Sequence, residues 1–450
     1  MRTDLEIFKA YDVRGIYNQS LTEEIAYNIG KAFVCFLKCK EVIVGTDMRI
    51  SSPKLSKAFM KGAVEQGANV IFIGEVCTDA VYFASGFLDK PAVMFTASHN
   101  PPQYNGIKFC KNGAVPINED TGLKEIKAII EENKFQNFPK KNFGRVIKKE
   151  ILKKYVEHVR KFIVAKNLGK LKIAVDAGNG MAGKIIPLVY NDMPVKIVPL
   201  YFRLDGNFPN HPADPSKYEN LAKLQEAVKE KKCDFGIAFD GDADRIFFVD
   251  EKGNVVNSSV ISALIIKNLL KKSKNQKVIY NAVCSHIVPE TIKQYKGVPI
   301  IERVGHSFIK ETMRKTRALF ACEHSAHYYY RDNYRADSGI ITSLIVYEIV
   351  SKEGKPLSAL LEEFRKYNTI GEASIEVKDK NAKLRQIETE YKKKNPAKIS
   401  KLDGITAEFG RWWFNVRPSN TEPLLRLNLE ADSKELMEEK KEELMNVIKS

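Results

Sequence analysis

Short apolar runs rich in β-branched and aromatic residues alternate with longer amphipathic stretches along most of this chain. "EVIVGTD" at 41–47 predicts a strand, and "SPKLSKAFMKGAVEQGA" at 52–68 predicts a helix. "NVIFIG" at 69–74, "AVMFTAS" at 92–98 and "KIAVDAG" at 172–178 predict further strands with helical patterns between them. Strands that alternate with helices form βαβ units, so we expect α/β domains with mostly parallel sheets and right-handed crossovers.

The C-terminal part has a different pattern. "ASIEVKD" at 373–379, "ITAEFGRWWFNV" at 405–416 and "LLRLNLEA" at 424–431 predict a small sheet whose strands are joined by loops. A final helix is expected to start at Asp432, because Glu435 follows three residues later in a capping-box pattern. This part is therefore expected to be α+β.

Composition limits the class of protein. The chain has 450 residues, a formal net charge of +16 and seven cysteines without a C-x-x-C pair. Scattered cysteines in odd number favour reduced thiols. Because the N-terminal residues lack a signal-peptide pattern and no apolar run could cross a bilayer, we expect a cytoplasmic protein without a membrane partner. The lysines are spread along the chain, often beside glutamates, so a phosphorylated small molecule is favoured over nucleic acid as the partner of this positive charge.

An acidic loop separates two apolar runs in "FGIAFDGDADRIFFVD". Asp240, Asp242 and Asp244 repel one another unless a cation lies between them, and hard oxygen ligands suit magnesium or manganese. An EF-hand is rejected, because Arg245 stands where that loop needs glycine and a strand follows instead of a helix. An exposed acidic turn without a metal is the alternative.

The stretch "VMFTASHNPPQYN" places Ser98 and a histidine where a predicted strand ends, without the glycines of a nucleophile elbow. Ligand sites of α/β proteins gather at such strand ends. Lys108 follows in "YNGIK", and Arg14 lies in "YDVRG" near the N-terminus. The alternative for both residues is that they are ordinary charged side chains on the protein surface.

Two later loops carry polar groups suited to a phosphorylated sugar. "FNVRPSNTEPLLRL" combines a guanidinium, hydroxyls and an amide that suit a phosphate, although an ordinary Pro-Ser-Asn turn is the alternative. In "CEHSAHYYYRD", Glu323, Ser325 and His327 would share one face of an extended strand. Carboxylate and hydroxyl groups suit sugar hydroxyls, and a histidine can transfer a proton near neutral pH. A polar strand end with a hydrogen-bonded histidine is the alternative.

Taken together, these loops resemble the α-D-phosphohexomutase superfamily. "TASHNP", "YNGIK", "DGDADR", "GHS", "CEHSAH" and "RPSNTEP" follow one another in that family's order, and "GTDMRISS", "DAGNGMAG" and "DGNFPNHPADP" also fit. The resemblance runs from Ala10 to Glu430. It implies three similar α/β domains and a smaller C-terminal domain around a central cleft. With the polar transitions near 140–150 and 366–372 and a turn after Asp250, we expect domains at 1–147, 148–251, 252–367 and 368–450.

The same resemblance implies a role for each loop. Ser98 would carry the phosphoryl group and, with the three aspartates, bind one Mg²⁺ ion. Glu323 and Ser325 would contact the sugar hydroxyls. The clamp for the non-reacting phosphate would consist of Arg417, Ser419, Asn420 and Thr421. The residues near the transferred group would be Arg14, Lys108, Arg245, His306 and His327.

The implied activity interconverts hexose 1-phosphate and hexose 6-phosphate through a phosphoserine and a hexose 1,6-bisphosphate. The sugar-reading loop looks most like phosphomannomutase/phosphoglucomutase members, with phosphoglucosamine mutase as the nearest alternative. A magnesium-dependent sugar phosphatase is a more distant alternative. The sequence leaves open whether the protein is a monomer or a dimer, and whether Lys108 or His327 handles the proton.

Several residues depart from the common family pattern. Ala243 replaces a glycine in the acidic loop, and its Cβ disfavours a positive φ, so we expect that loop to bend elsewhere. Cys322 and Ala326 replace glycines of the sugar-reading motif, and Asp79 stands where a proline often follows Thr78. These changes are expected to affect sugar positioning more than phosphoryl chemistry.

Overall fold

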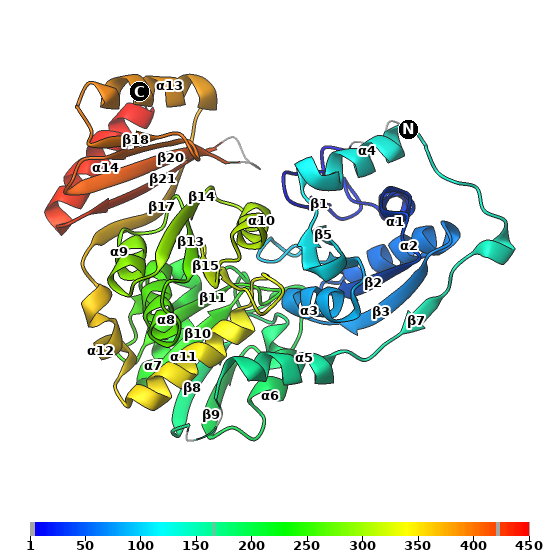
Figure 1. Cartoon of the computed structure of the whole chain (residues 1–450), viewed down its shortest axis with the longest axis horizontal. Coiled ribbons are helices and arrows are strands. Elements are labelled where there is room, and N and C mark those ends of the chain that lie inside the picture. Colours follow the sequence, from blue (N-terminus) through cyan, green and yellow to red (C-terminus); the bar gives the residue numbers. More distant parts are fainter. Residues whose placement is uncertain (1–4, 165, 167, 420–423, 450) are drawn as a thin grey trace.

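The computed structural model describes residues 5–164, 166, 168–419 and 424–449, and it contains four successive sheets (Figure 1). The first three carry helices on their faces and mix parallel with antiparallel pairs, whereas all the pairs of the fourth are antiparallel. The expected class, three α/β domains followed by a smaller α+β domain, is therefore confirmed.

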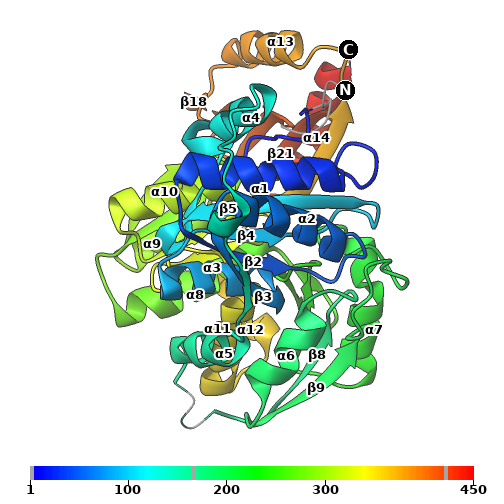
Figure 2. The same ribbon diagram turned by 90° about the vertical axis from the view of Figure 1, so that its right-hand side faces the viewer.

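The first sheet has the strand order β1-β5-β4-β2-β3-β7, with β6 beside β5. Its strands are β1 (Val13–Ile16), β2 (Glu41–Thr46), β3 (Asn69–Glu75), β4 (Ala92–Phe95), β5 (Tyr104–Lys111), β6 (Val115–Pro116) and β7 (Val146–Lys148). Its helices are α1 (Glu23–Leu37), α2 (Ser52–Glu65), α3 (Thr78–Leu88) and α4 (Lys124–Glu131). Helices α1 and α2 pack together on one side of the sheet (Figure 2), and α3 packs on the opposite side, toward the rest of the chain.

The second sheet has the order β12-β11-β10-β8-β9. Its elements are α5 (Leu152–Val159), β8 (Leu171–Asp176), α6 (Ala182–Tyr190), β9 (Val195–Leu200), α7 (Ala222–Glu230), β10 (Phe235–Phe239), β11 (Ile246–Asp250) and β12 (Val255–Val256). Strands β10 and β11 are buried along their whole length. The acidic loop therefore joins two buried strands in the interior of the sheet.

The third sheet has the order β14-β13-β15-β16. Its elements are α8 (Ser258–Lys272), β13 (Lys277–Asn281), α9 (Ile287–Gln294), β14 (Val298–Glu302), α10 (His306–Thr316), β15 (Phe320–Cys322), β16 (Tyr328–Tyr330), α11 (Gly339–Glu353) and α12 (Leu357–Leu361). Helix α11 is buried on all sides over most of its length, as its nearly uniform apolar sequence requires. One hydrophobic core runs through this helix and joins the first three domains.

The C-terminal sheet has the order β17-β21-β20-β19-β18 and its own core. Its elements are β17 (Asn368–Glu376), α13 (Lys380–Lys392), β18 (Lys398–Ser400), β19 (Ile405–Glu408), β20 (Trp412–Pro418), β21 (Leu424–Ala431) and α14 (Lys434–Lys449). The predicted start of the last helix at Asp432 is wrong by two residues. The hydroxyl of Ser433 accepts a hydrogen bond from the Leu436 amide at 3.2 Å, so Ser433 supplies the cap.

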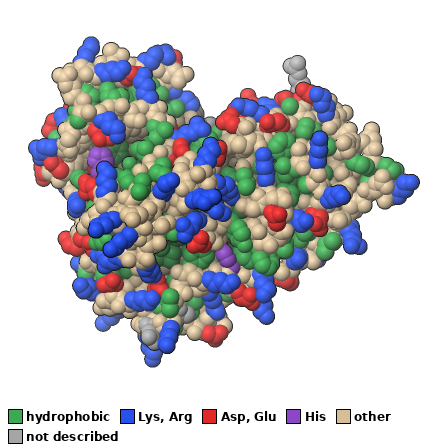
Figure 3. All heavy atoms as spheres, viewed as in Figure 1, with side chains coloured by type: hydrophobic (Ala, Val, Ile, Leu, Met, Phe, Trp, Pro, Cys, Tyr) green, Lys and Arg blue, Asp and Glu red, His purple; other side chains and the backbone are tan. Residues whose placement is uncertain are grey.

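The surface is hollowed between the C-terminal domain and the first domain (Figure 3). The exact domain boundaries stay predictions. Because β7 pairs with β3 and β12 pairs with β11, we propose that the first two boundaries lie just after Lys148 and Val256. Among the described residues, no helix combines the length and the apolar character that crossing a membrane requires.

Candidate active site

Ser98 lies in the loop that follows β4, and its backbone has a φ of 50°, in the left-handed region. The amide of Ser98 donates to the Thr96 hydroxyl at 2.9 Å, which helps to hold this conformation. Its own hydroxyl donates to the carboxylate of Asp240 at 2.5 Å, although the two residues are 142 positions apart. The structure thus brings the predicted serine to the predicted acidic loop.

Asp240, Asp242 and Asp244 are buried, and one carboxylate oxygen from each lies within 4.8 Å of the others. The alternative of an exposed acidic turn is therefore wrong. The expectation that the loop bends away from Ala243 is also wrong, because Ala243 itself has a φ of 63°. Dense packing of this buried loop overrides the small preference of alanine against the left-handed region.

Two basic residues neutralise part of the acidic cluster. The Lys108 ammonium, carried by β5, lies 3.0 Å from Asp242 and 2.5 Å from Asp244. Arg245 follows the acidic loop directly, and its Nε lies 3.0 Å from Asp240 while its Nη2 lies 3.4 Å from the Ser98 hydroxyl. Both side chains are largely buried, so these ion pairs lie in a medium of low dielectric constant.

These charges shift the pKa values of the cluster. Burial, with the neighbouring charges of Asp244 and Asp242, raises the pKa of Asp240. Burial alone would lower the pKa of Lys108, but the two carboxylates that it contacts hold that pKa well above its usual value. Lys108 therefore stays a cation at neutral pH.

The sugar-reading segment is not extended, so the condition under which Glu323, Ser325 and His327 would share one face of a strand is not met. Between β15 and β16 the chain turns, Ala326 has a φ of 65°, and the Glu323 amide bonds to the carbonyl of His327. The turn still gathers the three side chains. His327 Nδ1 lies 3.0 Å from the Ser325 hydroxyl and 3.7 Å from a Glu323 oxygen.

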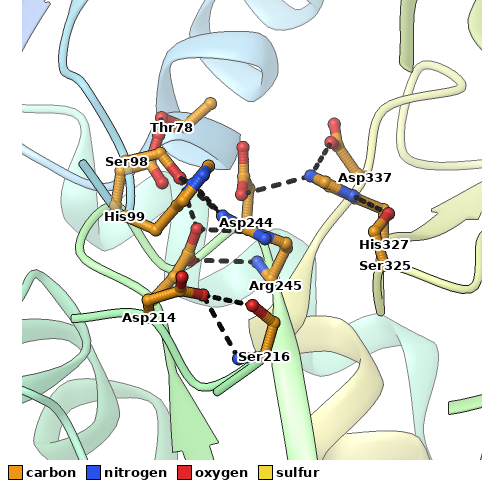
Figure 4. A network of polar contacts seen from close by, with 12 residues as sticks. Thr78, Ser98, His99, Asp214, Ser216, Asp244, Arg245, Ser325, His327 and Asp337 are labelled. Atoms are coloured by element: carbon orange, nitrogen blue, oxygen red, sulfur yellow. Dashed lines mark hydrogen bonds and ion pairs between the residues drawn. The ribbon is translucent and has the colours of Figure 1, made fainter. Parts of the chain in front are cut away.

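His327 connects this turn to the acidic loop. Its Nε2 lies 3.5 Å from Asp244 and 3.9 Å from Asp337 (Figure 4). Burial would lower the pKa of His327, but the carboxylates of Asp244 and Glu323 raise it above its usual value. In addition, the backbones of Arg245 and His327 form an isolated antiparallel bridge, which holds the two loops in register.

His306 begins α10 beside the same turn. The amide of Gly305 donates to Glu323 at 3.2 Å, and Tyr329 also donates to this carboxylate. Burial and the nearby charge of Lys310 hold the pKa of His306 well below its usual value, so His306 is neutral at physiological pH. Glu323 itself is 2% exposed and is fixed by these donors.

Arg14 lies on β1, beside the loop of Ser98. Its guanidinium donates to the side chain of Asn100 and to Asp12, the latter at 2.6 Å. It also donates to the carbonyl of Ala97 at 3.4 Å. Arg14 is therefore next to Ser98 in space as well as in the predicted set.

The predicted phosphate clamp lies in the C-terminal domain. Arg417, on β20, donates to Glu372 at 2.6 Å, and Ser419 is buried at the end of this strand. Asn420 and Thr421 lie outside the described residues. Arg417 makes no contact with the acidic loop in the described part of the chain. Burial and the charge of Glu323 raise the pKa of Tyr11, in the first domain, to about 12. The positive charge of Arg417 acts in the opposite direction and lowers this pKa.

Sequence reasoning missed three residues of this site. The Thr78 hydroxyl donates to Asp242 at 2.5 Å, and Asp337 contacts both His327 and, at 2.7 Å, the ammonium of Lys310. Thr78 begins a helix far from the acidic motif in sequence, and a buried Lys–Asp pair has no local pattern. Only "GHS", which precedes Lys310 on the same helix, offered an indirect signal.

The donor set suits a hard divalent cation. Oδ1 of Asp242 is buried and accepts no hydrogen bond from the described residues. Such an oxygen is costly to bury unless a cation or another donor meets it. Three clustered carboxylates and a serine oxygen match the oxygen ligands that Mg²⁺ prefers.

Models of the phosphoglucomutase/phosphomannomutase family match nearly the whole chain. The alpha/beta/alpha domains I, II and III match residues 5–137, 153–253 and 257–367, and the C-terminal domain matches residues 372–447.

Individual relatives agree with this match. A phosphomannomutase of Methanocaldococcus jannaschii is 39% identical over 446 residues, covering 99% of this chain and 98% of the relative. The solved structure of a phosphoglucomutase/phosphomannomutase family protein from Burkholderia thailandensis superposes with a TM-score of 0.89 at 29% identity, covering 98% and 97% of the two chains. An Aspergillus fumigatus N-acetylphosphoglucosamine mutase, solved with GlcNAc-6P and magnesium, shares the fold at 14% identity with a TM-score of 0.62, covering 100% and 96%.

Proposed function

Because this chain belongs to the phosphoglucomutase/phosphomannomutase family, we propose that it interconverts the 1-phosphates and 6-phosphates of mannose and glucose. It is a phosphohexomutase, an isomerase of phosphorylated sugars. The observation that carries the specific proposal is the contact between Ser98 and the acidic loop. A serine hydroxyl 2.5 Å from a buried three-carboxylate cluster, with Arg245 beside it, is suited to carry a phosphoryl group.

We assign the divalent cation to Asp240, Asp242 and Asp244 together with an oxygen of Ser98 or of its phosphoryl group. When bound there, Mg²⁺ would neutralise charge that develops on the phosphoryl group during transfer. The protein supplies two further positive charges, because Lys108 and Arg245 contact the same cluster. Fixed charges of this kind stabilise phosphoryl transfer without reorganising during the reaction.

In the proposed cycle, the sugar 1-phosphate binds with its phosphate at Arg417 and Ser419 and its hydroxyls at Glu323 and Ser325. Phospho-Ser98 then transfers its phosphoryl group to the sugar O6, so the Ser98 Oγ–P bond breaks and an O6–P bond forms. The hexose 1,6-bisphosphate then reverses its orientation in the cleft, so that its 1-phosphate faces Ser98. Its 1-phosphoryl group returns to Ser98, and the 6-phosphate leaves.

We assign the proton of the attacking sugar hydroxyl to His327. Lys108 is held as a cation by two carboxylates, so it cannot accept this proton at neutral pH. Burial would lower the pKa of His327, but the carboxylates of Asp244 and Glu323 raise it above its usual value, and its Nδ1 lies 3.0 Å from the hydroxyl of Ser325, one of the proposed sugar contacts. Histidine is the side chain that most often serves as a general acid or base in such transfers.

The purified protein, incubated with mannose, glucose and glucosamine 1-phosphates, Mg²⁺ and a trace of bisphosphate, tests this function. We expect the mannose and glucose 6-phosphates to form, and Ser98→Ala to lose this conversion. Release of inorganic phosphate without isomerisation would point to a phosphatase instead. Preference for the glucosamine substrate would point to phosphoglucosamine mutase.

A further inference from the structure

Arg49, in the segment "GTDMRISS" after β2, has no part in the cycle described above, although it is one of the largest fully buried side chains. We infer that Arg49 is a positioning residue for phosphoryl transfer: its guanidinium holds the loop of Ser98 in the conformation that directs the hydroxyl at the acidic cluster. This inference rests on the proposed function, because it concerns how Ser98 is placed for that reaction.

The guanidinium donates to four backbone carbonyls, three in the Ser98 loop and one at the start of β5. Nη2 donates to Ser98 at 2.8 Å and to Asn100 at 2.6 Å, while Nη1 donates to Pro101 at 2.8 Å and to Tyr104 at 2.9 Å. All four acceptors lie within residues 98–104, on both sides of the turn after Ser98. A planar fork of fixed donors can satisfy such an arrangement, whereas an ammonium cannot span it.

The carbonyl of Ser98 itself is one of these acceptors, and Ser98 has a left-handed backbone. A residue other than glycine keeps this conformation only where its surroundings determine it strongly. The hydrogen bond from Arg49 to the Ser98 carbonyl fixes the peptide group after Ser98. The hydrogen bond from the Ser98 amide to the Thr96 hydroxyl fixes the peptide group before it. The direction of the Ser98 hydroxyl is thereby set from both sides.

Arg49 is itself held in place. Its Nε lies 3.3 Å from Oδ2 of Asp47, and the side chains of both residues are fully buried. The other oxygen of Asp47 accepts from the Arg49 amide at 3.0 Å and from the Ser52 hydroxyl at 2.6 Å. The guanidinium therefore has a fixed orientation before any substrate binds.

The second domain packs against the same residue. The ring of Phe208 lies 5.1 Å from the Arg49 guanidinium carbon, and a Cβ on Gly206 would approach the Arg49 Cα to 2.8 Å. Both residues belong to "DGNFPNHPADP", a segment of the domain that also carries the acidic loop. Arg49 thus connects the Ser98 loop with the domain that supplies Asp240.

Replacement of Arg49 tests this role in the full-length enzyme. Arg49→Lys keeps the positive charge but cannot satisfy all four carbonyls. We expect kcat to fall about 100-fold or more, as for an oriented group displaced by about 1 Å, while KM for the sugar 1-phosphate changes less than about threefold. The rate at which glucose 1,6-bisphosphate phosphorylates Ser98, followed by intact mass, should fall in parallel. Hydrogen exchange should rise in residues 98–104 and stay unchanged elsewhere.

Two further variants separate positioning from general stability. Arg160→Lys is the matched control, because Arg160 also donates to several backbone carbonyls, but these belong to residues 188–191 of the second domain and not to the Ser98 loop. It should keep the wild-type kcat. Phe208→Leu removes the ring that faces Arg49 and should cause a smaller fall in kcat than Arg49→Lys.

An Arg49→Lys variant with wild-type kcat would overturn this inference, as would one in which exchange rises uniformly across all domains. A wild-type enzyme that isomerises the sugar without phosphorylating Ser98 would instead refute the proposed function, and the positioning role with it.

Discussion

A Cβ atom on Gly241 would lie only 2.5 Å from the carbonyl oxygen of Ser98. The acidic loop and the serine loop, which come from different domains, are therefore packed backbone against backbone. This approach accounts for the glycine between Asp240 and Asp242 and explains how the serine hydroxyl reaches the carboxylates.

Gly241→Ala should push these two loops apart. We expect kcat to fall by about 10²-fold, because small displacements of reacting groups have effects of this size. Overpacking should lower the free energy of unfolding by about 1–3 kcal/mol. Steady-state kinetics and urea unfolding measure the two effects. Gly169→Ala is the control, since its Cβ would meet Ser351 no closer than 3.3 Å. Full activity in Gly241→Ala would contradict the close packing.

Asp79 predicts a pH dependence of stability. It is fully buried at the junction of three domains, and its Oδ2 accepts from Tyr155 at 2.6 Å and from Ser338 at 2.5 Å. Burial raises its pKa from 3.8 to about 6. The folded protein thus binds this proton more tightly than the unfolded chain, so the free energy of unfolding falls as pH rises from about 4 to about 6.

Asp79→Asn should remove this loss of stability. Both hydrogen bonds go to one oxygen, which the asparagine carbonyl can replace. We expect the variant to be more stable than the wild type by up to about 3 kcal/mol at pH 8, and by little at pH 4. Thermal unfolding over this pH range measures the difference. Glu435→Gln, at an exposed carboxyl, should show no such trend. The prediction fails if the difference in free energy of unfolding between Asp79→Asn and the wild type is smaller at pH 8 than at pH 4.

Mg²⁺ should stabilise the folded protein. Three clustered carboxylates repel one another, so a cation that binds only the folded state raises the free energy of unfolding by about 1.4 kcal/mol for each tenfold excess over Kd, and the melting temperature rises with it. Scanning calorimetry in EDTA and in increasing MgCl₂ measures this shift. Asp242→Asn should reduce it, whereas Asp192→Asn, at an exposed position, should not. An equal shift in the Asp242→Asn variant would argue against the proposed ligands.

Arg417 should affect substrate binding and not phosphorylation of the serine. Its guanidinium is nearly buried and lies in a domain different from that of Ser98. Arg417→Gln should raise KM for the sugar phosphate about 10- to 100-fold, as expected from the loss of a hydrogen bond to a charged group. After incubation with the hexose bisphosphate, the fraction of protein phosphorylated at Ser98 should equal that of the wild type. Arg411→Gln, an exposed arginine of the same domain, is the control. An unchanged KM would remove Arg417 from the clamp.

Much of this organisation could be predicted from local patterns. The alternation of apolar runs and amphipathic segments predicts the α/β domains, because hydrophobic periodicity reflects local burial. The spacing of Asp240, Asp242 and Asp244 between two apolar strands predicts a cation site, because clustered carboxylates have few other stable arrangements. The order of the motifs indicates the family.

Other features depend on contacts between distant segments. Alanine at position 243 argued against a left-handed bend, yet the folded protein adopts one at this fully buried residue. Neither the contact of Thr78 with Asp242 nor the four carbonyls held by Arg49 has a pattern in the local sequence.

The sequence by itself thus determined which chemical groups this protein has and which strands and helices carry them, because side-chain identity and periodicity are local properties. Only the tertiary structure decided that Ser98 faces Asp240, that His327 meets Asp244 and that the Arg49 guanidinium donates to the carbonyl of Ser98. The reason is physical: the first two contacts join residues of different domains and the third joins two separate loops of the first domain, so all of them form only when the folded core has brought their backbones together.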